Sequence, residues 1–338
     1  MSKKYLSDYL TDYLTRYLPL QIGASPNTIK SYRDAFIVFL RYCRDELKIK
    51  PEKLTMDQIS RKTVEGYLQW LEKNKGCAVS TRNHRLTVIH ALARYIAVED
   101  PQYMSRCQEI LGVDFKKCVK KEVEYLTVDE LKIIFEQPDT RSKNGQRDLA
   151  MLSLLYDSGA RVQELVDLKL KDVRFTKPAT VTLTGKGNKS RIVPLMTDTG
   201  SLLEKYTSNY SITEPEQYLF VNKMKQKLTR SGVEYVISKY VTKAQDSHPE
   251  MTISNVTPHI FRHSKAMHLV QANVNLIYIR DFLGHESVKT TEIYAKADSA
   301  AKREALEKAS EKIIPESRYK KKKREELLFW LKEIIYGI

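Results

Sequence analysis

The sequence predicts a mainly α-helical protein of two domains, the second of which carries a small antiparallel β-sheet. Three observations support this prediction. Apolar residues recur at helical spacing through most of the 338 residues. A basic connector poor in large apolar side chains interrupts that pattern after residue 112. The period then changes from helix to strand between 179 and 195.

Tyrosines repeat every fourth residue from Tyr5 to Tyr17, with a leucine after each of them. This spacing places them along one side of a helix, where they serve as core packing or as an interface. Pro19 and Gly23 follow, and we expect them to end this first helix.

Ser25 and Pro26 mark the start of a second helix, since serine is a favoured N-cap and proline suits the first helical position. We expect this helix to run to about Leu47. A third helix is expected over 62–75 and a fourth over 80–98.

The first turn of the fourth expected helix carries Arg82, Asn83 and Arg85 on its polar side. Side chains of these types reach phosphates and base edges in a major groove. An ordinary solvated helix face is the alternative, and these positions alone fit it equally well. We take the three residues as candidate DNA contacts.

A basic connector with the sequence GVDFKKCVKKEVEY separates the two domains. We assign residues 1–112 to a helical N-terminal domain, 113–124 to the linker and 125–315 to the second domain. A basic segment and an amphipathic helix are expected over 316–338.

The second domain is expected to combine helices with one hairpin. Residues 127–130 have the pattern of a capping box before an apolar run, and another helix is expected over 145–158. β-Branched residues flank a Gly-Lys-Gly-Asn turn between 179 and 195, which is typical of an antiparallel hairpin. From about Gly232 the pattern is again helical, with a break near 249–258.

The net charge is the most informative feature of the composition. Lys and Arg outnumber Asp and Glu by 57 to 42, a formal charge of +15, so the protein should attract a polyanion. Nucleic acid is the expected partner, with an acidic membrane as the competing one. The chain has no run of about 18 apolar residues and no signal segment, so we expect a cytoplasmic protein without membrane contact.

The sequence contains no motif that is typical of metal binding or redox chemistry. The seven histidines show no HExxH pattern, and the four cysteines lack the close pairing of zinc or redox motifs. We expect reduced, structural cysteines, no metal ligands and no cofactor. Any phosphate chemistry would then proceed without a metal.

Four short segments stand out beyond their helical or strand pattern. They are SGARVQELVDL at 158–168, TGKGNKSR at 184–191, PHIFRHS at 258–264 and LGHESVKTTEIY at 283–294. In this order and spacing, behind a basic helical N-terminal part, they resemble the tyrosine recombinases, the family of phage integrases and Xer resolvases. The resemblance covers nearly the whole chain.

The resemblance implies a C-shaped clamp around duplex DNA, with a core-binding, SAM-like N-terminal domain and a catalytic second domain. It also implies strand cutting through a covalent 3′-phosphotyrosyl intermediate, without metal or ATP. Phe261 stands where the family often has leucine, which is a conservative change. The catalytic residues that match the family's motifs are Arg161, Lys186, His259, Arg262, His285 and Tyr294.

Physical chemistry supports roles for the cationic residues. A phosphodiester under attack gathers negative charge on its nonbridging oxygens, and the planar guanidinium groups of Arg161 and Arg262 can bind two of them. Lys186, at a hairpin tip, can protonate the leaving 5′ oxygen, with an ordinary turn lysine as the alternative. Lys189 and Arg191 are then expected to contact the DNA backbone.

His259 and His285 titrate near neutral pH, so either can hydrogen-bond a phosphate oxygen or relay the proton of the tyrosine. A cationic cluster around Tyr294 should favour its phenolate by lowering its pKa. We interpret His263 as structural or supporting. Glu164 is either a partner of an arginine or a surface carboxylate.

The end of the chain combines charge with an apolar stripe. Six of the seven residues from Arg318 to Arg324 are basic, and the stripe follows between Leu327 and Ile335. So much apolar surface should dock rather than stay in water. It docks either on its own domain or, as the resemblance implies, on a neighbouring protomer of a tetramer assembled on DNA.

We predict a site-specific DNA recombinase that serves the integration, excision or transposition of a mobile element. An Xer-type chromosome-dimer resolvase or an invertase is the alternative. A type IB topoisomerase shares the chemistry but relaxes a single duplex. A DNA-binding regulator that keeps the fold without cutting would lack Arg161, Arg262 or Tyr294, and all three are present.

Overall fold

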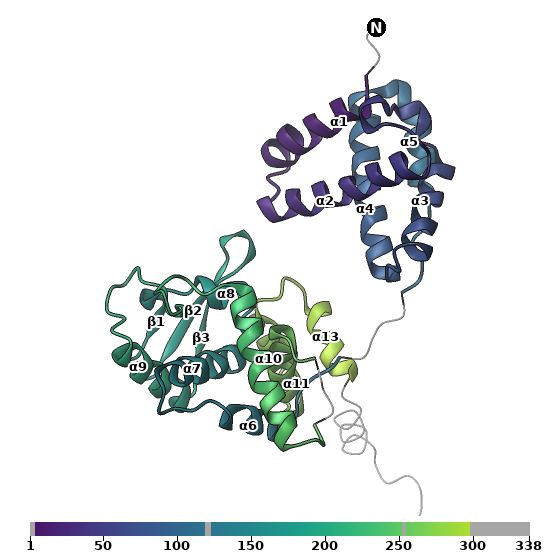
Figure 1. Cartoon of the computed structure of the whole chain (residues 1–338). Coiled ribbons are helices and arrows are strands. Elements are labelled where there is room, and N and C mark those ends of the chain that lie inside the picture. The colour runs from purple at the N-terminus through teal and green to yellow at the C-terminus, as the bar shows by residue number, and fades with distance from the viewer. Residues whose placement is uncertain (1–3, 119–122, 252–254, 298–338) are drawn as a thin grey trace, which may run out of the picture. The chain divides into compact units, whose positions relative to one another are not determined.

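The computed structural model describes residues 4–118, 123–251 and 255–297 (Figure 1). The chain divides into two compact units, Met1–Lys121 and Glu122–Ile338, and the division falls inside the expected connector. Both units are mainly helical, and the second carries a three-stranded antiparallel sheet. The predicted fold class, two mainly helical domains with one small sheet, is confirmed.

The first unit is built of α-helices that alternate with short turns. Its main elements are α1 (Leu6–Asp12), the π-helical segment η1 (Tyr13–Gln21), α2 (Pro26–Asp45), α3 (Arg61–Lys73), α4 (Val79–Glu99) and α5 (Met104–Leu111). Short 3₁₀ turns lie at η2 (Pro51–Lys53), η3 (Met56–Gln58) and η4 (Pro101–Tyr103). Helix α5 has no counterpart among the elements expected from the sequence.

The first helix does not end at Pro19, contrary to the expectation. After α1 the chain continues through Pro19 in the wider turns of η1, and the amide of Ile22 donates to the carbonyl of Tyr17 over 3.0 Å. In α geometry a proline ring clashes with the carbonyl four residues earlier. Turns whose hydrogen bonds reach five residues back change that spacing, so they accommodate the proline.

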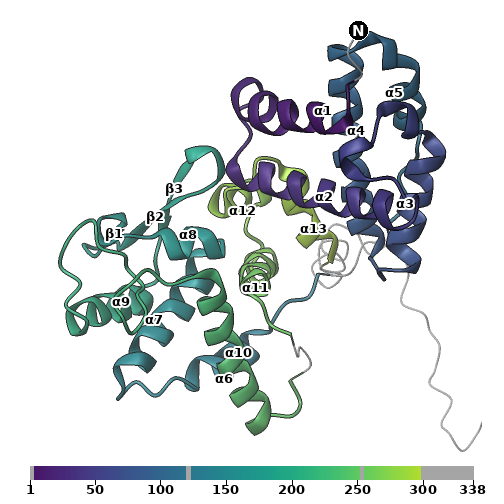
Figure 2. The same cartoon turned by 45° about the horizontal axis from the view of Figure 1, so that its top comes forward.

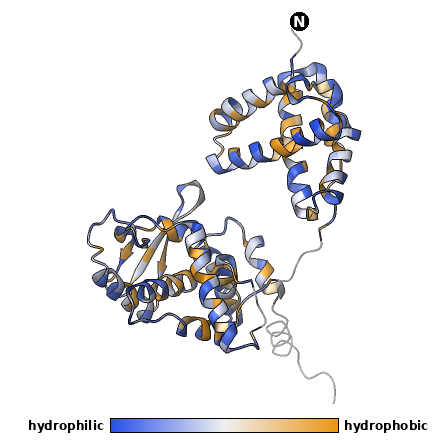
Figure 3. Ribbon diagram, viewed as in Figure 1, coloured by the Kyte–Doolittle hydropathy of each residue, from blue (hydrophilic) through white to orange (hydrophobic). Residues whose placement is uncertain are grey.

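Apolar faces of the helices form the core of the first unit. Figure 3 shows hydrophobic residues where α2 and α4 cross and hydrophilic residues along their outer sides. Tyr9 and Tyr13 are buried, and the ring of Tyr13 lies 5.1 Å from that of Tyr95, so these tyrosines of the stripe pack in the core. The hydroxyl of Ser25 accepts a hydrogen bond from the amide of Thr28, which confirms the predicted N-cap.

The second unit combines its sheet with a larger group of helices. The strands are β1 (Val173–Arg174), β2 (Thr180–Thr184) and β3 (Ser190–Pro194), antiparallel in the order β1-β2-β3. The helices are α6 (Val128–Glu136), α7 (Lys143–Ser158), α8 (Val162–Asp167), α9 (Thr197–Asn209), α10 (Arg230–Ser247), α11 (Pro258–Gln271), α12 (Leu276–Leu283) and α13 (Val288–Ala297). Two 3₁₀ turns, η5 (Leu170–Asp172) and η6 (Lys186–Asn188), flank β1 and β2.

Strands β2 and β3 form the hairpin that the sequence predicted. The amide of Gly185 donates to the carbonyl of Lys189 across the tip, over 2.9 Å. Gly187 has a φ of 73°, in the left-handed region that glycine adopts without steric cost. The tip η6 therefore closes the hairpin as a short turn between β2 and β3.

Helix α7 is the centre of the second unit. Most of its residues are buried, and it packs against α9 and α11. Helices α12 and α13 pack against each other, and α13 also packs against α11 (Figure 2). This packing brings together the C-terminal end of α7 and the segments 258–264 and 283–294, which are far apart in the sequence.

No helix in the described ranges is both long and apolar enough to cross a membrane. The basic segment and the amphipathic helix expected over 316–338 lie outside the described residues.

Ser264 joins the start of the second unit to α11. Its buried hydroxyl accepts a hydrogen bond from the amide of Leu126 over 2.8 Å and donates to the carbonyl of Ile260. Ser264→Ala should leave the buried Leu126 amide without a partner and lower the free energy of unfolding by about 1–3 kcal/mol. Urea denaturation followed by circular dichroism measures this loss.

Ser201→Ala provides the matched control. The hydroxyl of Ser201 also donates to a carbonyl four residues earlier in its helix, that of Thr197, but this pair is exposed. The control substitution should change the free energy of unfolding by less than about 0.5 kcal/mol. Equal losses in the two variants would contradict the role assigned to the buried bond of Ser264.

Candidate active site

Two glycine turns frame the candidate site. Gly159 ends α7 with a φ of 56°, and Gly284 ends α12 with a φ of 64°. A Cβ at Gly159 would lie 2.9 Å from a side-chain atom of Leu283, and one at Gly284 would lie 2.9 Å from a guanidinium nitrogen of Arg191. Glycine is therefore the residue that suits both the left-handed backbone and the close neighbours.

Arg262 connects the two turns. It is 2% exposed, and its Nη1 and Nη2 atoms donate to the carbonyls of Gly159 and Leu283, each over 2.6 Å. Burial, with a smaller effect from Arg161, lowers the pKa of Arg262 to about 10, so the guanidinium stays charged at neutral pH. Because each Nη atom carries two N–H groups, one on each remains for another acceptor.

Glu164 holds two further arginines. Its carboxylate accepts hydrogen bonds from Arg161 over 2.8 Å and from both terminal nitrogens of Arg191 over 3.0 and 2.8 Å. Burial acts to raise the pKa of Glu164, but the hydrogen bonds and charges of Arg191 and Arg161 outweigh it and lower the pKa to about 2. The carboxyl group is therefore ionised at neutral pH.

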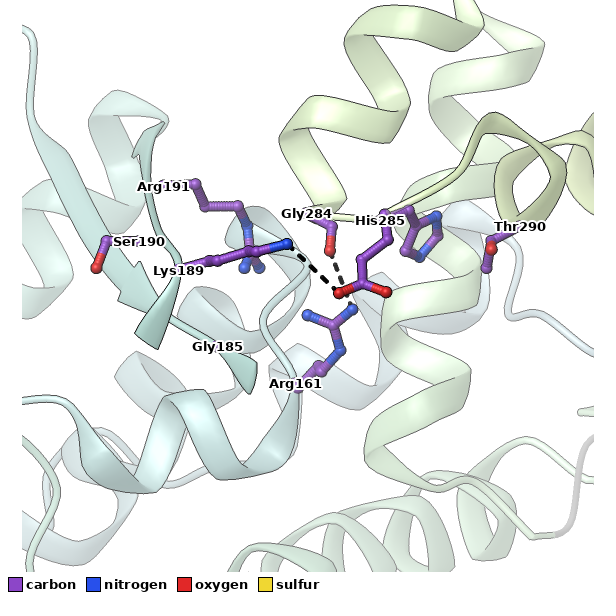
Figure 4. Close-up of a pocket in the computed structure, with 9 residues that line it drawn as sticks. Arg161, Gly185, Lys189, Ser190, Arg191, Gly284, His285 and Thr290 are labelled. Atoms are coloured by element: carbon purple, nitrogen blue, oxygen red, sulfur yellow. Dashed lines mark hydrogen bonds and ion pairs between the residues drawn. The ribbon is translucent and has the colours of Figure 1, made fainter. Parts of the chain in front are cut away.

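Arg161 and Arg191 border an open pocket of about 440 Å³ between the hairpin and the turn after α12 (Figure 4). The side chain of Arg161 is 38% exposed, and its Nη2 donates to the carbonyl of Gly284 over 3.2 Å. Lys189 and Glu286 form an exposed ion pair at 3.6 Å. The pocket is lined by Arg161, Gly185, Lys189, Ser190, Arg191, Gly284, His285, Glu286 and Thr290.

A row of aromatic rings, three from histidine and one from Tyr294, lies close to these arginines. The rings of His259 and His263 are parallel within 14°, with centroids 5.7 Å apart. Nδ1 of His263 is hydrogen-bonded to the hydroxyl of Tyr294 over 2.8 Å. The ring of His285 lies 6.4 Å from that of Tyr294, and its Nδ1 is hydrogen-bonded to the hydroxyl of Thr291 over 2.9 Å.

Burial keeps this row electrically neutral. It lowers the pKa of His263 and of His285 to about 4, with nearby positive groups adding to the effect. Burial also raises the pKa of Tyr294, which is 1% exposed, and the charges of Arg262 and Arg161 only partly oppose it. Arg262 and Arg161 thus favour the phenolate, as expected. The expected net lowering of the pKa of Tyr294 is nevertheless wrong for the free protein, because desolvation of the phenolate outweighs their attraction.

The structure places most of the expected catalytic side chains close together. Lys186 lies in the hairpin tip η6, and its side chain lies outside the described part of the structure. Among the described residues, no three His, Cys, Asp or Glu side chains are grouped so that they could hold a metal ion. The side chains that gather are Arg161, His259, Arg262, His285 and Tyr294.

The two candidate DNA contacts of the hairpin differ in the exposure of their side chains. Lys189 is exposed at the rim of the pocket. The side chain of Arg191 is only 12% exposed, because it is bound to Glu164 and donates to the carbonyl of Phe282 over 2.9 Å. Arg191 therefore supports the pocket wall through protein contacts.

The three candidate DNA contacts of the first unit also differ in whether their side chains are bound to other protein groups. Arg82 donates to the carbonyl of Asp114 over 3.1 Å, and the amide of Asn83 donates to the carbonyl of Lys116 over 2.7 Å. Both side chains thus bind the first residues of the connector. Arg85 borders an open hollow between the N-terminal ends of α2 and α4.

His263 lies in a position that its place in the sequence did not predict. It was interpreted as structural or supporting, yet its ring is the one that contacts the hydroxyl of Tyr294. A signal was available in the sequence, since His259 and His263 are four residues apart and therefore share one face of a helix.

Models of known families match both units. The model of the phage integrase family matches residues 124–301, and that of the phage integrase N-terminal SAM-like domain matches residues 11–100. The chain is 35% identical over 301 residues to the putative integrase/recombinase y4rC of Sinorhizobium fredii, covering 88% of this chain and 89% of that protein. It is 31% identical over 288 residues to the tyrosine recombinase XerD of Oceanobacillus iheyensis, covering 84% of this chain and 92% of that protein.

Solved structures show the same fold. The Tn1549 transposon integrase in complex with transposon right end DNA has a TM-score of 0.68 at 17% identity, covering 89% of this chain and 99% of that one. The XerH site-specific recombinase bound to difH has a TM-score of 0.65 at 23% identity, covering 84% and 80%. These likenesses concern the fold, whereas the family models and sequence relatives decide the membership. The chain belongs to the phage integrase family and is a tyrosine recombinase, an enzyme of site-specific DNA recombination.

Proposed function

We propose that Tyr294 cuts duplex DNA by attacking a phosphodiester bound beside the arginines, which forms a 3′-phosphotyrosyl bond and releases a 5′ hydroxyl. Lys186 supplies the proton that the leaving 5′ oxygen needs. The bond energy stays in the phosphotyrosine, so attack by a 5′ hydroxyl can rejoin the strand without ATP. The phosphate is held by Arg161, His259, Arg262 and His285.

The anchoring of Arg262 is the observation that carries this proposal. Its two bonds to the carbonyls of Gly159 and Leu283 hold a buried positive charge in a fixed position. Tyr294 lies within the field of Arg262 and Arg161. Cations that are already in place stabilise the charge developing on the nonbridging oxygens without reorganisation during the reaction.

Glu164 is proposed as a positioning residue. It binds the guanidinium of Arg161 on one side and that of Arg191 on the other. A planar guanidinium fork must be correctly oriented to bind two phosphate oxygens. Glu164 thus acts on the reaction through the orientation of Arg161.

The biological task that we propose is integration, excision or transposition of a mobile element. Support comes from the similarity to the putative integrase/recombinase y4rC and from the fold shared with the Tn1549 transposon integrase. The 31% identity to XerD supports the second candidate, an Xer-type chromosome-dimer resolvase or an invertase.

A type IB topoisomerase would use the same bond chemistry on a single duplex. The match of residues 11–100 to the SAM-like domain of phage integrases favours recombination. We further propose that double-stranded DNA binds both units, with Arg85 and Lys189 among the contacts. Four protomers would assemble on DNA in the cytoplasm or nucleoid, with the C-terminal helix exchanged between neighbours.

The covalent intermediate can be tested with a suicide substrate, a nicked duplex that carries the candidate recombination site. Incubation in EDTA should give protein covalently bound to the 3′ phosphate, seen as a shifted band on a denaturing gel. Tyr294→Phe should abolish that band while leaving DNA binding within a few-fold, because it removes only the attacking oxygen.

Two results would contradict this mechanism. One is a covalent complex that persists in Tyr294→Phe, and the other is cleavage that needs magnesium. With intact duplexes, recombinant joints should form. Relaxation of supercoiled DNA without such joints would favour the topoisomerase.

Glu164→Gln tests the positioning role and the stability of the site together. The pKa of Glu164 is lowered from its ordinary value to about 2, so ionised Glu164 stabilises the fold above about pH 4.5 and loses that effect as the pH falls toward 2. Glu164→Gln should lower the free energy of unfolding at pH 7 by about 3 kcal/mol. Urea denaturation should show the difference between the two proteins shrinking below pH 4.5.

The same variant should form the covalent complex more slowly, by about 10- to 100-fold, because Arg161 loses its partner. Glu216→Gln is the control, since Glu216 also binds two cations, Lys169 and Lys171, but is exposed. It should cleave at the wild-type rate. Wild-type cleavage by Glu164→Gln would exclude the positioning role.

A further inference from the structure

The hydrogen bond at the hydroxyl of Tyr294 points to a residue outside the expected catalytic set. Nδ1 of His263 lies 2.8 Å from that hydroxyl. Nδ1 of His285 is instead engaged with Thr291, and the ring of His259 stacks on His263. Of the described histidines, His263 is therefore the one placed to receive the proton of Tyr294.

We propose that His263 is the general base of strand cleavage, and that its Nδ1 takes the phenol proton as Tyr294 attacks the phosphorus. This inference rests on the proposed role of Tyr294 as nucleophile. The base is then neither His259 nor His285, the two histidines expected from the sequence to relay this proton.

The proton and electron pairs balance without a further reactant. In cleavage the Oη–H bond of Tyr294 breaks and an N–H bond forms at Nδ1 of His263. The Oη–P bond forms while the P–O5′ bond breaks, and the 5′ oxygen takes its proton from a separate acid, Lys186 in the proposed function. In rejoining, the protonated His263 returns its proton to the departing Tyr294.

The surroundings make His263 a base that works only with DNA bound. Burial, His259 and Arg262 lower the pKa of the imidazole to about 4, so in the free protein it is neutral and able to accept. The same surroundings disfavour the imidazolium that proton transfer would create. A phosphodiester at Arg262 and Arg161 brings negative charge close to the ring, which stabilises the imidazolium.

Geometry, not basicity, separates His263 from His285, because burial and nearby positive groups lower the pKa of both to about 4. Nδ1 of His285 is hydrogen-bonded to Thr291, and its ring centroid lies 6.4 Å from that of Tyr294. The bound phosphate makes a free phenolate less favourable as well, because the two negative charges repel. Concerted removal of the proton by a neighbouring base is the way to avoid that phenolate.

His263→Asn separates proton transfer from positioning. The asparagine side chain can place an amide oxygen or nitrogen near the site of Nδ1, so it keeps a hydrogen-bonding group but cannot accept a proton. Single-turnover formation of the covalent complex on the suicide substrate should fall by about 10²- to 10⁴-fold at pH 7. DNA binding and Tm should stay close to wild type.

The pH dependence of cleavage distinguishes a base from a residue with a purely structural role, because loss of a structural role would not change that dependence. As the pH rises toward the pKa of the phenol, solvent removes the proton, so the deficit of His263→Asn should shrink by about tenfold per pH unit. Fluorinated tyrosine at position 294, a more acidic phenol, should likewise restore cleavage in His263→Asn. It should not restore cleavage in Arg161→Ala.

His268→Asn is the matched control. His268 lies in the same helix, and its Nδ1 is hydrogen-bonded over 2.9 Å to a different phenol, that of Tyr156. This variant should cleave at the wild-type rate at every pH.

Cleavage by His263→Asn at or above the wild-type rate, or a deficit that neither pH nor fluorotyrosine reduces, would overturn the inference. Tyr294→Phe distinguishes a failure of the proposed function from a failure of the role of His263. A covalent complex in Tyr294→Phe would overturn the proposed function itself. Its absence, together with wild-type cleavage in His263→Asn, would overturn only the role of His263.

Discussion

The rest of the site depends on one buried cation, the guanidinium of Arg262. Moving such a group out of water costs several kcal/mol unless hydrogen bonds replace its hydration. The carbonyls of Gly159 and Leu283 supply two of them. Both lie at C-terminal ends of helices, where carbonyls lack intrahelical donors and carry partial negative charge. The C-terminal ends of α7 and α12 are thus joined to α11 through a single charged group.

The charges around Arg262 are unbalanced in the free protein. Glu164 is ionised and shared between Arg161 and Arg191, while Arg262 is tied to neutral carbonyls. Buried or half-buried positive charge of this kind is stabilised by an anion that brings its own negative charge. A DNA phosphate bound as we propose would balance these charges, and the +15 charge of the chain favours its approach.

Burial also keeps Tyr294, the proposed nucleophile, unreactive in the free protein. Tyr294 is 1% exposed, and desolvation raises its pKa while it lowers the pKa of His263 and His285. In the free protein the phenol and the imidazoles are therefore all neutral. A phosphate beside Arg161 and Arg262 shifts this balance toward an imidazolium, so reactivity is coupled to the substrate by the same electrostatic forces that bind it.

The sequence by itself determined the features that depend on neighbours in the chain. The N-cap at Ser25, the capping box at 127–130 and the hairpin turn at Gly187 follow from local backbone preferences and local hydrogen bonds. The motif positions of Arg161 and Tyr294 could likewise be matched by order and spacing. The passage of the first helix through a proline was not predicted, because local propensity describes α geometry and not the wider turns observed.

Only the tertiary structure decided which side chains touch. His263 and Tyr294 are 31 positions apart in the chain, and their contact depends on how α13 packs against α11. Arg191 and Asn83 are residue types that commonly contact DNA, but each is bound to a protein partner that folding brings to it. The pKa of Tyr294 was misjudged for the same reason: spacing along the chain reveals which charges are near, whereas the desolvation that outweighs them arises from three-dimensional packing.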